Sequence, residues 1–313
     1  MLEGWPPPII DPAGPYAGPI STLTWALFAM AALVLVVVIA AMWVALFGKA
    51  QQKRRLGGTA VIWIGGIAFP VLVLTILLYF GLTLTRSLSY SIGGDEMRVR
   101  ITGEMWWWRV AYLDDRRRPV IHDANELHIP VGKPVVLELE SADVIHSFWV
   151  PRLSGKLDMI PGRLNMKVIQ ANEPGVFGGQ CAEFCGGPHA LMGFIVVAHP
   201  PEQFEKLMQA RLSPRGATGA RPAVAGAELF QSAGCAACHR IAGTNANGLA
   251  GPDLTHVGTR RTLGAGILPN NRGTMMGWIA NSQAIKPGNR MPPYTMLSGE
   301  ELTELAVYLE AQR

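Results

Sequence analysis

The sequence contains few cysteines and few charged residues. Its 313 residues include four cysteines, which form two close pairs, Cys181 with Cys185 and Cys235 with Cys238. Both pairs fall inside motifs of cofactor type, so no cysteine is left for a structural disulfide or for a lipid anchor near the N-terminus. Charged residues make up only 16% of the chain. Together with a mean hydropathy of +0.22, this scarcity of charge indicates membrane segments rather than one large soluble core.

Basic residues are missing from the N-terminal end and form no stripe elsewhere. The formal net charge is only +4, and no basic run is interleaved with aromatic residues, so nucleic acid is excluded as a partner. Residues 1–20 contain no Lys or Arg and therefore lack the basic region of a secretory signal. We expect residues 1–21 to be an extramembrane segment that lies on a membrane partner.

Two long runs of the chain are apolar. Residues 22–47 contain no charge, and a second run covers about residues 60–84, with Pro70 inside it as an expected kink. Each run can cross a hydrocarbon core of roughly 30 Å as a helix, the alternative being a buried helix of a soluble protein. Residues 48–55 between them hold four basic residues and no acid. The positive-inside rule makes this loop cytoplasmic and puts everything after Arg86 on the other side, with the N-terminus. Residues 22–93 are thus a predicted two-helix hairpin.

Residues 94–212 show a different pattern, in which short runs of β type alternate with turn residues. The predicted strands cover residues 97–102, 106–112, 126–129, 135–139, 165–170 and 194–198. This spacing predicts a small antiparallel sandwich or barrel. A short helix is expected over residues 201–212, with Phe204, Leu207, Met208 and Leu212 on one face. Residues 213–223 have no periodicity and are interpreted as a linker.

The most informative stretch runs from Cys181 to Met192. It places Cys181, Cys185, His189 and Met192 in one tight loop, and His146 upstream can complete the set. Thiolate, imidazole and thioether ligands together favour copper over calcium or magnesium. The alternative is a zinc site or a disulfide with a nearby core His and Met. Zinc sites seldom use Met, and their ligand sets consist of Cys and His.

A second motif lies after the linker, where Cys235, Cys238 and His239 form the sequence Cys-x-x-Cys-His. This is the attachment motif of c-type haem, in which the two thiols bind the vinyl groups and the His becomes an axial iron ligand. A thioredoxin-like redox pair is the alternative for Cys-x-x-Cys alone, but no βαβ pattern surrounds it. Residues 224–313 are predicted to form a small all-helical cytochrome c domain of class I.

The sixth iron ligand is predicted to be a methionine, because Met is a ligand of electron-transfer haems and raises their reduction potential. We choose Met291, which stands in a Pro-bounded loop before the last helix. The other methionines of the region are Met275, Met276 and Met296, of which the first two lie in a predicted helix and are interpreted as packing residues. His256 is the rival ligand. Ser298 and Glu301 form a capping box at the start of the last helix.

The ligand loop, the His146 segment and the run from Asp158 to Asn165 resemble subunit II of haem-copper cytochrome c oxidases, which carries the dinuclear copper centre CuA. The resemblance spans about residues 22–210 and implies a cupredoxin-like Greek-key barrel with copper at one end. It implies that Cys181 and Cys185 bridge two coppers, that His146 and His189 bind one copper each, that Met192 binds one copper, and that Glu183 offers its backbone carbonyl to the other.

The resemblance also implies roles around the copper pair. Trp106, the first of three consecutive tryptophans, corresponds to the residue through which the electron from cytochrome c enters. For Trp107 and Trp108, a packing role in an amphipathic strand is equally open. The side chain of Glu183 is expected to reach a magnesium ion shared with subunit I. Asp158 and Arg163 resemble residues near that interface, with a structural salt bridge as the open alternative.

The fusion of such a subunit with a cytochrome c domain resembles the caa-type oxidases of bacteria. The resemblance implies an electron-input subunit that passes electrons from cytochrome c, by way of haem c and CuA, to subunit I, where oxygen is reduced and protons are pumped. The implied partners are subunit I, subunit III, cytochrome c and membrane lipid. The implied location is the bacterial inner membrane, which the chain crosses twice, with both redox domains on the periplasmic side.

Other functions fit the motifs less well. A quinol oxidase subunit lacks the copper ligands, and nitrous oxide reductase lacks the helical hairpin. A membrane-anchored copper carrier has no use for a haem domain. The remaining alternative is the CuA subunit of a nitric oxide reductase of the same haem-copper family, because the acceptor is bound by the partner subunit rather than by this chain.

Overall fold

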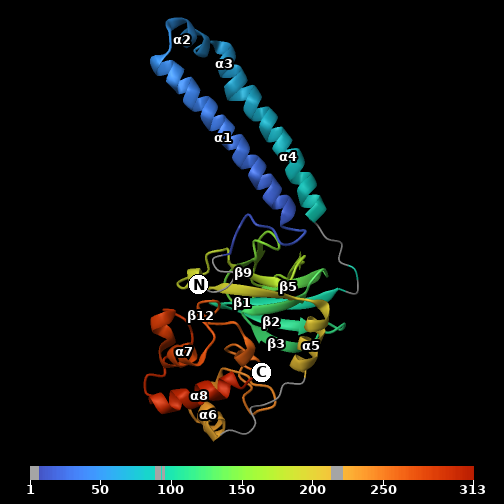
Figure 1. The fold of residues 1–313 in the computed structure, drawn as a ribbon, viewed down its shortest axis with the longest axis vertical. Coiled ribbons are helices and arrows are strands. Elements are labelled where there is room, and N and C mark those ends of the chain that lie inside the picture. The colour runs from blue at the N-terminus through green and yellow to red at the C-terminus, as the bar shows by residue number, and fades with distance from the viewer. Residues whose placement is uncertain (1–6, 89–92, 94–95, 213–220) are drawn as a thin grey trace. The chain divides into compact units, whose positions relative to one another are not determined.

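The computed structural model describes residues 7–88, 93, 96–212 and 221–313. It divides into two compact units, one of residues 18–92 and one that combines residues 1–17 with residues 93–313 (Figure 1). Residues 1–6 of the predicted N-terminal segment and residues 213–220 of the predicted linker lie outside the described residues.

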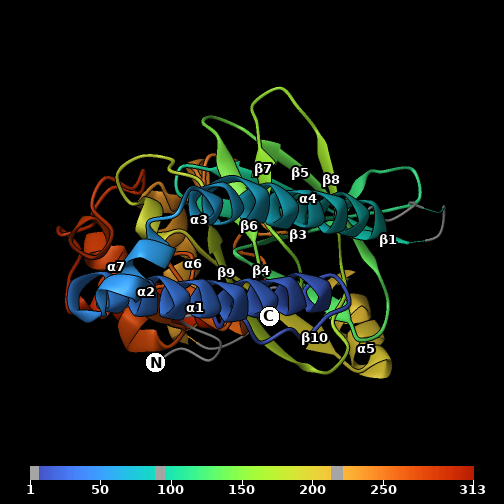
Figure 2. The same ribbon diagram turned by 90° about the horizontal axis from the view of Figure 1, so that it is seen from above.

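The first unit is a helical hairpin (Figures 1 and 2). Its elements are α1 (Gly18–Phe47), α2 (Ala50–Leu56), α3 (Thr59–Trp63), the π-helical turn η1 (Ile64–Ala68) and α4 (Phe69–Leu88). Two spans, Gly18–Phe47 and Thr59–Arg86, are long and apolar enough to cross a membrane, and none of their most apolar stretch is buried within the protein. The alternative of buried helices in a soluble core is therefore wrong for both. The basic residues Lys53, Arg54 and Arg55 fall in the short helix between the spans.

The helix irregularity predicted at Pro70 is located just before that residue. Pro70 is in the first turn of α4, and the π-helical turn η1 directly precedes it. Proline has no N–H to give to the carbonyl one turn earlier, and its ring crowds that carbonyl. A π turn is one of the local adjustments by which a helix accommodates this loss inside a membrane.

The second unit contains a sandwich of two five-stranded sheets (Figure 1). The first sheet has the order β3-β2-β1-β5-β8 and the second the order β4-β10-β9-β6-β7. The strands are β1 (Met97–Glu104), β2 (Trp107–Leu113), β3 (Pro119–Ala124), β4 (Glu126–Pro130), β5 (Val135–Ser141), β6 (His146–Trp149), β7 (Leu157–Met159), β8 (Asn165–Ile169), β9 (Gly175–Cys181) and β10 (Gly193–His199). This confirms the sandwich that was predicted for residues 94–212, the predicted copper domain.

Two features of the sandwich depart from the sequence prediction. The pairs β1 with β5 and β4 with β10 are parallel, whereas purely antiparallel pairing was expected. The strands β3, β6, β7 and β9 had no counterpart among the predicted strands. Both β6 and β7 are short, and β9 carries glycines, which weaken the signal of alternating hydrophobicity.

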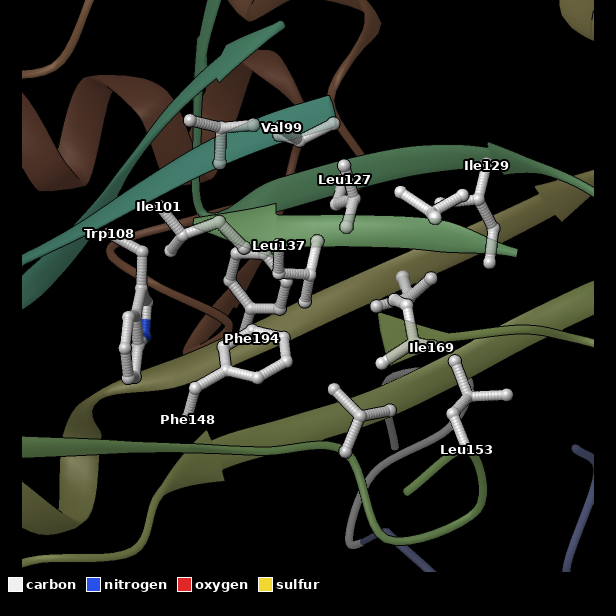
Figure 3. Packing of buried hydrophobic residues seen from close by; sticks show 14 of the residues in the cluster. Val99, Ile101, Trp108, Leu127, Ile129, Leu137, Phe148, Leu153, Ile169 and Phe194 are labelled. Carbon is white, nitrogen blue, oxygen red and sulfur yellow. The ribbon is translucent and has the colours of Figure 1, made fainter. Parts of the chain in front are cut away.

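Aromatic side chains fill the sandwich core. Trp108 is fully buried, and its ring centroid lies 5.9 Å from that of Phe148 and 5.8 Å from that of Phe194, both in edge-on contact (Figure 3). Phe148 and Phe194 are themselves 5.1 Å apart. Such edge-to-face contacts stabilise a core beyond the area they bury. Of the two roles left open for Trp108, the packing role is therefore the one observed.

Helix α5 (Pro201–Leu212) has the predicted bounds but not the predicted inner face. Phe204 is buried as expected, whereas Leu212 is 56% exposed. Arg211 is buried in its place. Its guanidinium donates to the carboxylate of Asp123 and, from Nη2, lies 2.9 Å from Nε2 of His128. The sequence pattern did not predict the burial of Arg211, because a buried arginine at a helix end can be recognised only when its acidic partner, here Asp123, is known.

The C-terminal part is helical, as predicted. It comprises α6 (Arg221–Ser232), the 3-10 turns η3 (Cys235–Ala237) and η4 (Val257–Thr259), the short strands β11 (Thr262–Leu263) and β12 (Leu268–Pro269), α7 (Arg272–Ile285) and α8 (Gly299–Glu310). The capping box of Ser298 and Glu301 is confirmed. Helices α6 and α8 cross closely at Gly226, where a Cβ atom would lie only 2.2 Å from the carbonyl oxygen of Glu304. Only glycine permits this approach of the two backbones.

A buried charge cluster joins the sandwich to the helical domain. The carboxylate of Asp123, on β3, accepts hydrogen bonds from Arg211 of α5 and from Nε of Arg260 in the helical domain, the latter at 2.7 Å. All three side chains are less than 8% exposed. Burial favours the protonated acid, but the two guanidinium groups outweigh it and hold the pKa of Asp123 far below its usual value.

Because both arginines depend on one carboxylate, we expect Asp123→Ala to destabilise the second unit by about 3–5 kcal/mol, the cost of leaving buried charges unpaired. The midpoint of denaturant unfolding of the detergent-solubilised chain, followed by tryptophan fluorescence, measures this. Asp114→Ala, which breaks an exposed pair with Arg118, is the matched control and should change the midpoint little. Equal midpoints for the two variants would contradict the role of Asp123.

Candidate metal and haem sites

The loop that carries the soft ligands is closed by backbone hydrogen bonds. Cys181 is the last residue of β9 and Gly193 the first of β10, and these strands pair antiparallel. The N–H of Cys181 donates to the carbonyl of Met192 at 3.0 Å, and the N–H of Ala182 donates to the carbonyl of Ser147 at 2.9 Å. The loop therefore begins and ends on adjacent strands, next to the strand that carries His146.

The five predicted side-chain ligands come together at this end of the sandwich. Between Cys181 and Cys185 the sulfur atoms are 3.7 Å apart. Nδ1 of His146 lies 3.9 Å from the sulfur of Cys181, and Nδ1 of His189 lies 3.4 Å from that of Cys185. The thioether sulfur of Met192 is 3.9 Å from the sulfur of Cys185. Within the described residues, this is where sulfur and imidazole donors converge on a common space, and the donor set fits copper.

His146 is held in one orientation by Asp143. Its Nε2 lies 2.9 Å from a carboxylate oxygen of Asp143, which leaves Nδ1 facing Cys181. Burial lowers the pKa of His146, but the hydrogen bonds with Cys181 and Asp143 outweigh it and raise that pKa. A carboxylate behind a metal-binding imidazole fixes its orientation and makes it a better ligand. Asp143 was not singled out from the sequence, although it stands three residues before His146.

The two thiols behave as a pair. The hydrogen bond with Cys185 lowers the pKa of Cys181, and His146 and backbone groups lower it further. The same contact raises the pKa of Cys185. The contact thus favours the thiolate form of Cys181, and thiolate is the form that binds metals. The carbonyl oxygen of Glu183 also lies close to this pair, 3.2 Å from the sulfur of Cys181.

Trp106 packs directly on the ligand loop. Its indole N–H donates to the carbonyl of Cys185 at 2.8 Å. A Cβ atom on Gly186, whose φ is +110°, would lie only 3.0 Å from the Trp106 ring, so this contact needs glycine. Trp107 instead lies under Arg109, 4.8 Å from the guanidinium carbon to the ring centroid. Of the three tryptophans, Trp106 is therefore the one in hydrogen-bond contact with the predicted copper ligands.

The predicted haem ligand His239 is also orientated by a hydrogen bond. Its Nδ1 lies 2.8 Å from the carbonyl oxygen of Pro252, so Nδ1 carries the proton and Nε2 is left for the iron. Burial lowers the pKa of His239, which keeps the imidazole neutral. Gly251 lies against this ring, where a Cβ atom would be 2.7 Å from Cε1. Pro252 was not recognised from the sequence as the partner of His239.

The methionines of the helical domain differ in their surroundings. Met275 is buried in the domain core and Met276 packs against it, as expected for packing residues. Met296 is 75% exposed. Met291 is partly buried against the same core, and its carbonyl accepts hydrogen bonds from Ser282 at 2.9 Å and Gln283 at 2.8 Å. The predicted ligand loop is thus tied to the end of α7.

The rival ligand His256 lies near the charged groups that join the two domains. Burial lowers its pKa to about 4, and Arg211 and Arg260 act in the same direction. His256 is 3% exposed, and its carbonyl accepts the N–H of Thr259 at 3.1 Å. Met291 therefore stays the predicted sixth ligand, and His256 stays its rival.

Known proteins match both halves of the chain. The family described as "Cytochrome C oxidase subunit II, periplasmic domain" matches residues 113–199, and the family described as "Cytochrome c" matches residues 223–312. "Cytochrome c oxidase subunit 2" of Alkalihalophilus pseudofirmus is 32% identical over an alignment that covers 96% of this chain and 90% of that protein. The protein of the same name from Bacillus subtilis is 29% identical over 84% of this chain and 78% of its own length.

A solved structure is also similar, the periplasmic domain of subunit II of cytochrome oxidase of Bradyrhizobium japonicum. It is 30% identical, with a TM-score of 0.36, over 39% of this chain and 96% of that chain. The relative from Alkalihalophilus pseudofirmus is matched over nearly all of both sequences, hairpin, sandwich and helical domain together. This chain therefore belongs to the cytochrome c oxidase subunit 2 family, in the form that continues into a cytochrome c domain.

Proposed function

We propose that this chain is the electron-input subunit of a respiratory cytochrome c oxidase. It accepts electrons from reduced cytochrome c in its C-terminal domain and delivers them through its copper domain to subunit I. The observation that carries the proposal is the convergence of two thiols, two imidazoles and a thioether at one end of the sandwich, in a chain that also carries Cys-x-x-Cys-His.

The proposed ligands of a dinuclear copper centre are Cys181, Cys185, His146, His189, Met192 and the carbonyl of Glu183. Their support is geometric, since the donor atoms face one another at separations of 3.2–3.9 Å. The residues also resist movement, because the loop is closed on paired strands over an aromatic core. A rigid site suits electron transfer, since ligands that barely move between redox states need little reorganisation.

The proposed haem ligands are Cys235 and Cys238 for covalent attachment, with His239 and Met291 on the iron. His239 is supported by its hydrogen bond to Pro252, and Met291 by its anchored loop. When bound, the haem and the copper pair supply the one-electron redox chemistry, for which side chains alone are not suited. The residues of the chain position the haem and the copper pair. We propose that Trp106, hydrogen-bonded to Cys185, is where the electron enters the copper domain.

The finer assignments concern the partners and the membrane. We propose that Glu183 contributes to a magnesium site shared with subunit I, because its carboxylate is 44% exposed and its ion pair with Lys156 is long, at 3.9 Å. Asp158, whose Oδ1 is buried without a hydrogen-bond partner among the described residues, belongs to the same proposed interface. Subunit III and lipid are proposed as further partners, and the bacterial inner membrane as the location.

Exchange of one bridging thiol tests the copper assignment. Cys185→Ser should abolish the mixed-valence copper signal in electron paramagnetic resonance and lower oxygen uptake from cytochrome c at least tenfold, since even supporting residues of metal sites are worth about 10–100-fold. The haem should stay reducible. Cys235→Ser is the reciprocal control, which should disturb haem attachment and leave the copper signal in place. Retention of the copper signal in Cys185→Ser refutes the ligand set.

Exchange of the proposed sixth ligand tests the haem assignment. Met291→Ala should remove the methionine–iron charge-transfer band at the red end of the oxidised spectrum and lower the reduction potential of the haem, because Met ligation raises it. Met296→Ala, at an exposed methionine five positions along the chain, is the matched control and should keep the band. An unchanged band in Met291→Ala moves the ligand to another residue, with His256 the next to test.

The terminal acceptor can be identified with the purified membrane complex. The complex is supplied with reduced cytochrome c, and the uptake of oxygen and of nitric oxide is measured with one electrode for each gas. We expect rapid oxygen uptake and, in sealed vesicles, acidification on the side of the redox domains. Uptake of nitric oxide with little oxygen uptake would keep the ligand assignments and assign the complex to denitrification instead. The similarity to proteins named cytochrome c oxidase subunit 2 favours oxygen.

A further inference from the structure

A buried lysine lies where the cytochrome c domain meets the copper-ligand loop. Lys286, directly after α7, is 3% exposed. Its ammonium donates to three backbone carbonyls, those of Trp106 at 2.6 Å, Leu191 at 2.8 Å and Gly264 at 3.0 Å. An ammonium group has three N–H donors, so these three carbonyls satisfy it completely.

Two of the three carbonyls belong to the copper domain, and both adjoin the proposed metal site. Trp106 is the residue whose indole donates to Cys185, and Leu191 immediately precedes Met192. Only Gly264 is in the domain of Lys286 itself. The complete set of acceptors therefore exists only while the two domains are in contact.

Two further contacts join the same parts of the two domains. The N–H of Gly193, next to Met192, donates to the carbonyl of Ala265 at 2.9 Å. Arg290, next to Met291, lies 3.3 Å from the carboxylate of Asp143, which orientates His146. The segment that bears the proposed iron ligand is thus in contact with residues that hold the copper ligands.

Lys286 contributes more to the stability of the contact between the two domains than the exposed ion pair of Arg290 and Asp143. Arg290 is 56% exposed in its pair with Asp143, so water competes with it. The Lys286 ammonium is withdrawn from water, which is costly unless every donor is paired, and the three carbonyls pair every donor. A compact ammonium suits such a cage of single acceptors better than the broad guanidinium of arginine.

We propose that Lys286 is a positioning residue for electron transfer between the two redox domains. Its ammonium fastens the Met291 side of the cytochrome c domain onto Trp106 and the copper-ligand loop. The inference rests on the proposed function and adds to it the group that sets the distance between the two redox centres. Lys286 touches neither metal, and it acts through the backbones of Trp106 and Leu191.

Amide hydrogen exchange in the intact oxidase complex tests the fastening directly. Two reporter amides cross between the domains, Gly193 to Ala265 and Arg261 to the carboxylate of Glu126. In Lys286→Met, exchange at Gly193 should rise roughly ten- to hundredfold, the effect of losing hydrogen bonds to a charged group. Amides of α8, which lie inside the cytochrome c domain, should exchange as in the wild type.

Stopped-flow reduction provides the functional readout. With reduced cytochrome c as donor, haem reduction in Lys286→Met should proceed at the wild-type rate, and the following copper reduction should slow at least about tenfold. Lys167→Met is the control, because Lys167 is a partly buried lysine on β8, a strand that pairs with β5 and not with the cytochrome c domain. It should leave both steps unchanged. Lys286→Gln, which keeps two N–H donors, should fall between wild type and Lys286→Met.

The outcomes separate this inference from the function it rests on. Unchanged exchange at Gly193 or unchanged copper reduction in Lys286→Met overturns the positioning role, as does a matching rise in exchange throughout α8, which would indicate general unfolding. If Lys286→Met does not incorporate haem, Lys286→Gln decides by the same criteria. If haem reduction leads to no copper reduction in the wild-type complex, the proposed function fails, whatever Lys286 does.

Discussion

The loop that carries the proposed copper ligands is closed by the backbone hydrogen bonds of Cys181 to Met192 and of Ala182 to Ser147, and the rest of the sandwich supports this closure. They place the ends of the loop on neighbouring strands, so that soft side chains from separate elements meet in a small space. Beneath them, Trp108, Phe148 and Phe194 form a close aromatic core (Figure 3). A packed core of this kind resists deformation, which is the property an electron-transfer site requires.

Buried charged groups lie at the contact between the two redox domains. Asp123 binds arginines from α5 and from the cytochrome c domain, while Lys286 binds carbonyls beside the proposed copper ligands. Each such group is costly in the wrong arrangement, because a buried charge without its partners loses its hydration without compensation. Apolar contacts tolerate sliding, whereas these groups accept only one register. The chain thereby defines the approach of the haem domain to the copper loop.

Much of the fold was predictable because its signals are local. Uncharged runs predicted the two spanning helices, Cys-x-x-Cys-His marked the haem domain, and the Ser298 capping box marked the start of α8. Predictions failed where the signal is not local. The strands β6 and β9 were missed, and both parallel pairs were unforeseen, since strand direction depends on connections across the whole sandwich. Leu212 was expected inside and Arg211 outside, and the partner Asp123, 88 residues away, reverses them.

The sequence by itself determined which chemistry the chain can host: the kinds of ligand atoms, their order along the chain, and the two segments that suit a membrane. These follow from residue identity and short spacing, which need no long-range contact. Only the tertiary structure decided which groups orientate the ligands and join the domains. Asp143 behind His146, Pro252 behind His239 and Lys286 between the domains have no motif of their own. Their roles come from partners brought near by folding, because hydrogen bonds and buried charges act over a few ångströms whatever the separation in sequence.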